Sequence, residues 1–189
     1  MKLYKIYSRA IGLLFALSLL CVGCENEDIL DINDLEISPS NPESVVIVEP
    51  DDGITSVNAL TKAINENGDA TYILRRDGVY YMEGKNVFKH NVVIKAENGS
   101  GKMPIIQPIC DAQGALNADM IRLEGSATFE NIYIIGKDAA TGNLMQRLFR
   151  IDESNVRLKF DNCFIDHCRN FCIRTDNVNN KFYLNNSTI

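Results

Sequence analysis

The sequence predicts an all-β fold, a parallel solenoid with a short helix at its N-terminal end. One observation is a repeated unit, in which an apolar residue, a polar residue and Asn precede a short strand that ends in Ile. A second set of short apolar strands lies between these units, and turns rather than helices join them. Short strands with no helical segment between them favour stacked coils over a sandwich.

The chain begins with the features of a secretion signal. Three basic residues and no acid occur in residues 1–23, and an apolar run of limited length, from 10 to 22, follows the basic start. The run ends in LLCVGC, which resembles a bacterial lipoprotein box because the small residue Gly23 precedes Cys24. The resemblance implies that the signal peptide 1–23 is removed and that Cys24 is lipidated, so that acyl chains anchor the protein in a membrane.

An acidic segment without basic residues, ENEDILDINDLE, follows Cys24. Its composition predicts a disordered tether over 24–44. The segment also resembles the export signal that follows the lipidated cysteine in surface lipoproteins of Bacteroidota-type bacteria. That resemblance implies an outer-membrane lipoprotein exposed at the cell surface, with its folded domain over 45–189.

The charge of the chain is informative about partners. It holds 19 Lys and Arg residues against 25 Asp and Glu residues, a net charge of −6 at pH 7. Because nucleic-acid binding requires many cations, this balance argues against a nucleic-acid partner.

The segment SVNALTKAINENG at 56–68 predicts a short helix that ends at Gly68, with an apolar face that includes Leu60 and Ile64. The strand pair DATYILRRDGVYY and the unit NVVIKAENGSGKMPII follow it. Together these segments resemble the first coils of the pectate-lyase-like superfamily, in particular the chondroitinase B and alginate lyase branch and Bacteroidota surface proteins with β-helical domains of unknown function. The resemblance covers 54–189 and implies a right-handed parallel β-helix (solenoid).

The repeated units begin at four asparagines and are separated by steps of 40, 31 and 24 residues. They are NVVI at 91–94, NIYI at 131–134, NCFI at 162–165 and NSTI at 186–189. The longer steps coincide with loop-like insertions at 97–103, 110–119 and 136–143. An asparagine at a corner tolerates the left-handed conformation of a tight turn. The side-chain amides of asparagines in successive coils can also hydrogen-bond to one another. The last unit ends at Ile189 without a capping segment, so we expect a chain truncated at its C-terminus.

Three cysteines occur close together, at Cys163, Cys168 and Cys172. The alignment predicts that Cys163 and Cys172 are small buried residues of strands and that Cys168 lies in a turn with His167. The spacing matches no recognised zinc site. A disulfide within the trio is an alternative for an exported protein.

The second strand set carries paired charges in three successive coils, at 120–124, 148–152 and 172–176. Arg122, Arg150 and Arg174 are each followed two residues later by an acid, respectively Glu124, Asp152 and Asp176. Residues two apart in a strand point the same way, so each pair is expected on the outer face. The favoured interpretation is a salt-bridge network. The alternative is a groove in which the arginines bind an acidic glycan and the three acids are candidate Ca²⁺ ligands.

The leading functional hypothesis is a surface lipoprotein that binds or handles acidic polysaccharide. The alternatives are the N-terminal part of a polysaccharide lyase acting by β-elimination, and a non-catalytic adhesin or spacer. Elimination needs a base and a cation that stabilises the enolate. No such set can be matched residue by residue, so the sequence identifies no catalytic residue.

Overall fold

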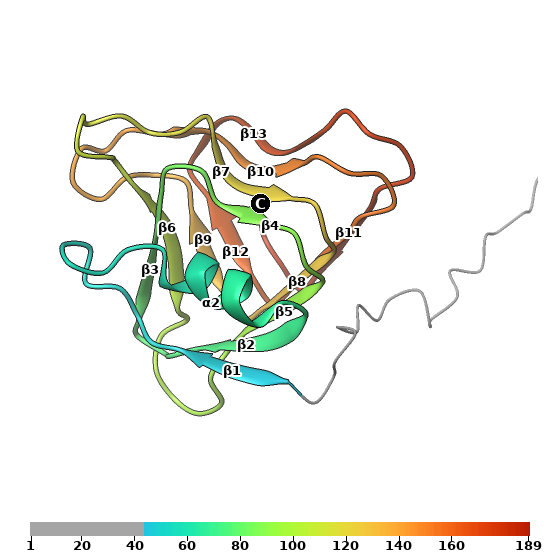
Figure 1. The fold of residues 1–189 in the computed structure, drawn as a ribbon, viewed down its shortest axis with the longest axis horizontal. Helices are drawn as coiled ribbons and strands as arrows, with labels where there is room; N and C mark the ends of the chain where they lie inside the picture. The colour runs from blue at the N-terminus through green and yellow to red at the C-terminus, as the bar shows by residue number, and fades with distance from the viewer. Residues whose placement is uncertain (1–43) are drawn as a thin grey trace, which may run out of the picture. The chain divides into compact units, whose positions relative to one another are not determined.

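The computed structural model describes residues 44–189 (Figure 1). The predicted signal peptide, the lipidation site Cys24 and nearly all of the predicted tether lie outside the described residues. Those residues belong to one compact unit, Leu35–Ile189. Their regular secondary structure is mainly β-strand, and the strands form three sheets in which every pairing is parallel. The expected all-β class is therefore confirmed for this part of the chain.

The strands are distributed over sheets A, B and C. Sheet A contains β1 (Val45–Val48), β2 (Ala70–Leu74), β5 (Val92–Ala96), β8 (Ala127–Glu130), β11 (Arg157–Asp161) and β14 (Lys181–Asn185) in this order. Sheet B contains β3 (Val79–Glu83), β6 (Ile105–Ile109), β9 (Tyr133–Ile135) and β12 (Phe164–Asp166). Sheet C contains β4 (Val87–Phe88), β7 (Asp119–Leu123), β10 (Met145–Ile151) and β13 (Cys168–Thr175).

The chain passes through sheets A, B and C in turn, and we call one such passage a circuit. The first circuit is β2–β3–β4, and the fourth is β11–β12–β13. Each strand pairs with the strand of the same sheet in the next circuit. In Figure 1 the three sheets lie around a common interior.

The single helix of the described residues, α2 (Ala59–Asn67), lies where the sequence predicts one. Leu60 and Ile64 are buried on its inner face, and Gly68 follows it with φ 71°, a left-handed value that glycine adopts without strain. The helix contacts β1, β2, β3 and β4, so it covers the interior at the first circuit (Figure 1). In residues 44–189 no helix is both long and apolar enough to cross a bilayer.

The interior is filled by columns of apolar side chains that align from circuit to circuit. In sheet B the column is Tyr80, Ile106, Ile134 and Ile165, all paired in register and buried. In sheet A, Phe129 and Phe160 stack with ring centroids 5.5 Å apart. The expected burial of Ile134 and Ile165, and of Val92, Ile132 and Cys163, is confirmed.

The alignment of the first asparagine unit is wrong. Asn131, Asn162 and Asn186 follow strands of sheet A and have φ between 47° and 58°, as a tight corner requires. Asn91 instead precedes a sheet A strand, and Val92 pairs with Ala127 rather than with a residue of the other units. The reason is that the insertion at 97–103 occupies the corresponding corner of the second circuit, so this corner has no asparagine unit.

The expected amide contact between corner asparagines is present for one pair. The side-chain amide of Asn162 donates to the side-chain oxygen of Asn131 in the circuit before. The side-chain oxygen of Asn91 has another partner, because it accepts from the backbone N–H of Ser126 at 3.0 Å. Asparagine therefore contributes to two kinds of corner, through left-handed backbone in one and through a side-chain hydrogen bond in the other.

The three neighbouring cysteines occupy different environments. Cys163 is buried, as expected, and burial raises the pKa of its thiol to about 11. Cys168 is the first residue of β13 rather than part of the turn, and Cys172 is half-buried rather than fully buried. The difference for Cys172 arises because β13 is the outermost strand of sheet C within the described residues, so one of its edges is uncovered.

Candidate functional site

The three arginines singled out by the sequence lie side by side on sheet C. Arg122 of β7 pairs in register with Arg150 of β10, which pairs with Arg174 of β13. The parallel pairing thus places all three arginines at equivalent positions of successive circuits.

Two aspartates alternate with these arginines to form an arginine–aspartate ladder of Arg122, Asp152, Arg150, Asp176 and Arg174. Asp152 accepts from Arg122 and, at 2.8 Å, from Arg150. Asp176 lies 3.5 Å from Arg150 and 3.2 Å from Arg174. The expected partner of Arg122, Glu124, is replaced by Asp152, because the next circuit brings Asp152 beside the Arg122 guanidinium.

The ladder is electrostatically satisfied at its centre. The side chain of Asp152 is only 17% exposed. Burial opposes its charge, but the hydrogen bonds from Arg122 and Arg150 outweigh burial and hold its pKa below the usual value. A guanidinium that is already paired with carboxylates attracts a further anion weakly. The geometry therefore fits the interpretation of a structural network better than that of an anion-binding groove.

The candidate calcium ligands do not form a metal cluster. Asp152 and Asp176 face arginines, as described above, and within residues 44–189 no group of three or more His, Cys, Asp or Glu side chains is arranged to hold a metal ion. The geometry of the ladder provides no separate cation site.

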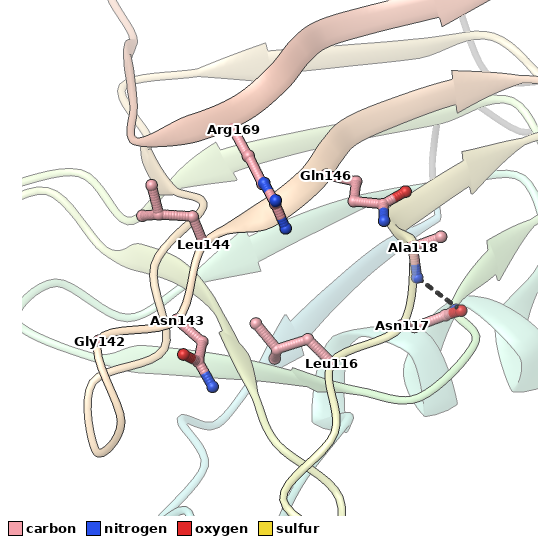
Figure 2. Close-up of a pocket in the computed structure, with 8 residues that line it drawn as sticks. All are labelled: Leu116, Asn117, Ala118, Gly142, Asn143, Leu144, Gln146 and Arg169. Carbon is pink, nitrogen blue, oxygen red and sulfur yellow. Dashed lines mark hydrogen bonds between the residues drawn. The ribbon is translucent and has the colours of Figure 1, made fainter.

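A hollow of about 560 Å³ lies at the opposite, N-terminal end of the same sheet C strands (Figure 2). Its lining comes from the loop before β7, the loop before β10, β10 itself and β13. The lining residues are Leu116, Asn117, Ala118, Gly142, Asn143, Leu144, Gln146 and Arg169. In Figure 2 the guanidinium of Arg169 points into the hollow, between Leu144 and Gln146 and toward Leu116.

Arg169 differs from the ladder arginines because its guanidinium has no partner among the described residues 44–189. No hydrogen bond or ion pair joins its guanidinium to any residue in 44–189, and the side-chain amides of Asn143 and Gln146 are likewise free within that range. By contrast, Asn117 uses its amide internally, donating to the carbonyl of Gly84 and accepting from the N–H of Ala118. The hollow therefore presents one unpaired cation and two unpaired amides to solvent.

The two loops that form its walls are fixed to one another. The buried carboxylate of Asp138 accepts from the backbone N–H of Cys110 at 3.2 Å and from both the N–H and the hydroxyl of Thr141. Burial opposes the charge of Asp138, but these bonds outweigh it and lower its pKa, so Asp138 stays ionised at neutral pH. Gln107 adds a further bond, to the carbonyl of Lys137 at 2.8 Å.

The strands below the hollow are also held in place. Arg147, which follows Gln146, donates to the buried carboxylate of Asp119, which follows Ala118. This ion pair joins β10 to β7 directly beneath the lining residues. The hollow is consequently preformed by buried hydrogen bonds and an ion pair.

The sequence predicted the parts of the hollow but not the hollow itself. The sequence predicts loops at the insertions 110–119 and 136–143, but it gives no sign that Arg169 lies beside them. The available signal was that each insertion directly precedes a strand of the same set, at 120–124 and 148–152. Loops that precede equivalent strands of successive coils must lie side by side.

Comparisons with known proteins provide no assignment. No protein-family model matches the sequence, and no curated protein matches it significantly.

Proposed function

We propose that residues 45–189 form a right-handed parallel β-helix of the pectate-lyase-like kind and that this domain binds acidic polysaccharide at the cell surface. The fold proposal is supported by the repeated passage through sheets A, B and C, by the left-handed corner asparagines and by the helix at the first circuit. It also rests on the resemblance of the segments at 56–106 to the first coils of that superfamily.

The observation that carries the binding proposal is the unpaired guanidinium of Arg169 above a preformed hollow. A uronate carboxylate is a planar acceptor that matches a guanidinium in two parallel hydrogen bonds. The amides of Asn143 and Gln146 provide donors and acceptors for sugar hydroxyls. Leu116 and Leu144 provide apolar contact for the face of a pyranose ring.

The size and charge of the hollow favour a short acidic segment of a glycan. Its volume of about 560 Å³ lies within the usual range for small-molecule sites. Because the chain carries a net charge of −6, its overall field disfavours a polyanion, and binding needs a local cation such as the Arg169 guanidinium. Binding at Arg169 is therefore expected to be local and to recognise a few sugar units.

The test is titration of polygalacturonate into the wild-type protein and into Arg169→Gln, with dextran as the neutral control. Loss of a charge-assisted hydrogen bond at this site should weaken binding by at least about tenfold. The matched control is the double variant Arg150→Ala, Arg174→Ala, which removes two cations from the ladder and leaves the hollow intact. We expect it to bind as the wild type does and to lose some stability.

Equal binding by Arg169→Gln and the wild type would reject the hollow as the site. Loss of binding in the ladder double variant alone would transfer the site to the ladder, against our interpretation. Release of unsaturated uronate ends during the titration would favour the alternative function, a lyase acting by β-elimination.

A further inference from the structure

Two cysteines bracket Arg169 in the sequence, and their sulfur atoms meet in the structure. The Sγ atoms of Cys168 and Cys172 are 2.7 Å apart. Non-bonded heavy atoms are most stable at roughly 3.5–4.0 Å, so the two sulfurs are closer than ordinary packing brings them. Both side chains are half-buried against the core.

A regular strand cannot bring these residues together, because four residues of a strand extend about 13 Å. The pairing of β13 with β10 shows that the strand is irregular between these two cysteines. Cys168 pairs with Met145, and Phe171 pairs with Arg147. The paired positions are therefore three residues apart in β13 but two residues apart in β10. The extra residue is a β-bulge, and bulges bend the strand and redirect its side chains. Arg169 is the residue directly after the first cysteine of this bulge.

The other described cysteines have different neighbours. The thiol of Cys163 donates to the carbonyl oxygens of Phe129 and Asp161, at 3.3 and 3.4 Å. The sulfur of Cys110 lies 3.7 Å from the hydroxyl of Thr141. Within residues 44–189, only Cys168 and Cys172 have another sulfur within bonding reach.

We propose that Cys168 and Cys172 form a disulfide that closes the bulge and holds Arg169 toward the hollow. The part of this proposal that concerns binding rests on the proposed function, whereas the bond itself does not. The oxidant is a donor disulfide, either a thiol–disulfide oxidoreductase or a small molecule. One thiolate attacks the donor and releases one donor thiol, and the second cysteine then displaces the other, so two hydrogens and two electrons pass from the protein to the donor.

The environment of Cys172 affects its reactivity. Burial raises the pKa of Cys172 to about 12, and hydrogen bonding and charge from Cys168 add to the effect. Since the thiolate is the attacking species, Cys172 is a poor first nucleophile at neutral pH.

The test uses the full chain with Cys163→Ala, which removes the second cysteine of the tryptic peptide 160–169. The protein is incubated with oxidised glutathione or with dithiothreitol, free thiols are blocked, and the denatured chain is digested with trypsin. Cleavage after Lys159, Arg169 and Arg174 separates the peptide 160–169, which holds Cys168, from the peptide 170–174, which holds Cys172. We expect the oxidised sample to contain the two peptides joined, two hydrogens lighter than their sum, and released by reduction. Recovery of both peptides unlinked after oxidation would overturn the proposal.

Two measurements test what the bond does to the folded protein. Closing this loop should raise Tm by roughly 4–8 °C and should slow trypsin cleavage after Arg169 in the native protein severalfold. Unchanged Tm and unchanged native cleavage would refute the claim that the bond holds Arg169. The control is Cys168→Ser, Cys172→Ser, which should behave like the reduced protein under both conditions.

Measuring polygalacturonate binding in both redox states distinguishes a failure of the disulfide proposal from a failure of the proposed function. Oxidised wild-type protein should bind polygalacturonate severalfold more tightly than reduced protein, and the double serine variant should show no redox dependence. If the oxidised protein has the disulfide but binds no polygalacturonate, the proposed function fails and the disulfide stands. If it binds equally well in both redox states, the positioning of Arg169 by the disulfide is wrong.

Discussion

Asp152 lies between two arginines at the centre of the ladder, so its charge contributes to the stability of sheet C. Since its folded-state pKa is lowered below the unfolded value of about 3.9, its contribution to stability is complete above that pH and is lost as the pH falls through the folded pKa. We predict that Asp152→Asn lowers the free energy of unfolding by about 1–2 kcal/mol at pH 7, measured by urea denaturation.

The pH profile checks this assignment. The difference between the wild type and Asp152→Asn should be constant from pH 7 to about pH 4.5 and should shrink below pH 4. Glu153→Gln is the matched control, because Glu153 is adjacent, exposed and makes no ion pair within the described residues. A difference that persists unchanged at pH 2 would show that the charge of Asp152 is not the cause.

Residue-scale prediction succeeded where one backbone requirement selects one residue type. Asn131, Asn162 and Asn186 were recognised because a left-handed corner favours asparagine. The same reasoning failed at Asn91, which is selected for its side-chain hydrogen bond to the next circuit. A single sequence does not distinguish these two uses of asparagine. Nor does it show that Arg169 lacks a partner, because pairing depends on side chains from three different circuits.

At the scale of elements, the column of buried side chains in sheet B allows a prediction about the energetic cost of removing one of them. Ile134 is fully buried, with Ile106 and Ile165 on either side of it. We expect Ile134→Ala and Ile165→Ala each to lower the free energy of unfolding by about 2–5 kcal/mol. Ile165→Ala should fall in the lower part of that range, because Ile165 lies on the outermost described strand of its sheet and its neighbours can relax more easily.

Urea denaturation of both variants measures these costs. Ile135→Ala is a suitable control, since Ile135 is only partly buried and points away from the column. A cost for Ile134→Ala no greater than that for Ile135→Ala would contradict the stacked interior.

Elements were predictable because their signals are local. Strand positions follow from short apolar runs, and α2 follows from its apolar face and from Gly68. The β-bulge at Cys168 leaves no such signal, because it exists only in the register between β13 and β10. The environment of Cys172 depends on the same register and on its place at the sheet edge. For this reason the sequence predicted a buried Cys172 and a turn at Cys168.

At the scale of the whole molecule, the location of the protein depends on residues outside those that the structure describes. We predict that the mature protein starts at lipidated Cys24 and partitions with membranes. Cys24→Ala should remain uncleaved or be released into the soluble fraction, as shown by fractionation and by the mass of the N-terminal peptide. Cys21→Ala is the control and should behave as the wild type does. Unchanged fractionation and migration of Cys24→Ala would refute lipidation at this residue.

The central claim is that an acidic glycan binds in the hollow at the N-terminal ends of the sheet C strands. Its most direct test is an NMR titration of the isotope-labelled protein with a galacturonate oligosaccharide, following the side-chain N–H signals of Arg169, Asn143 and Gln146. The account predicts saturable shifts of these signals, together with the backbone amides of 116–118 and 142–144, and small shifts at Arg122, Arg150 and Arg174. Saturable shifts confined to the ladder, or no shifts at all, would contradict it.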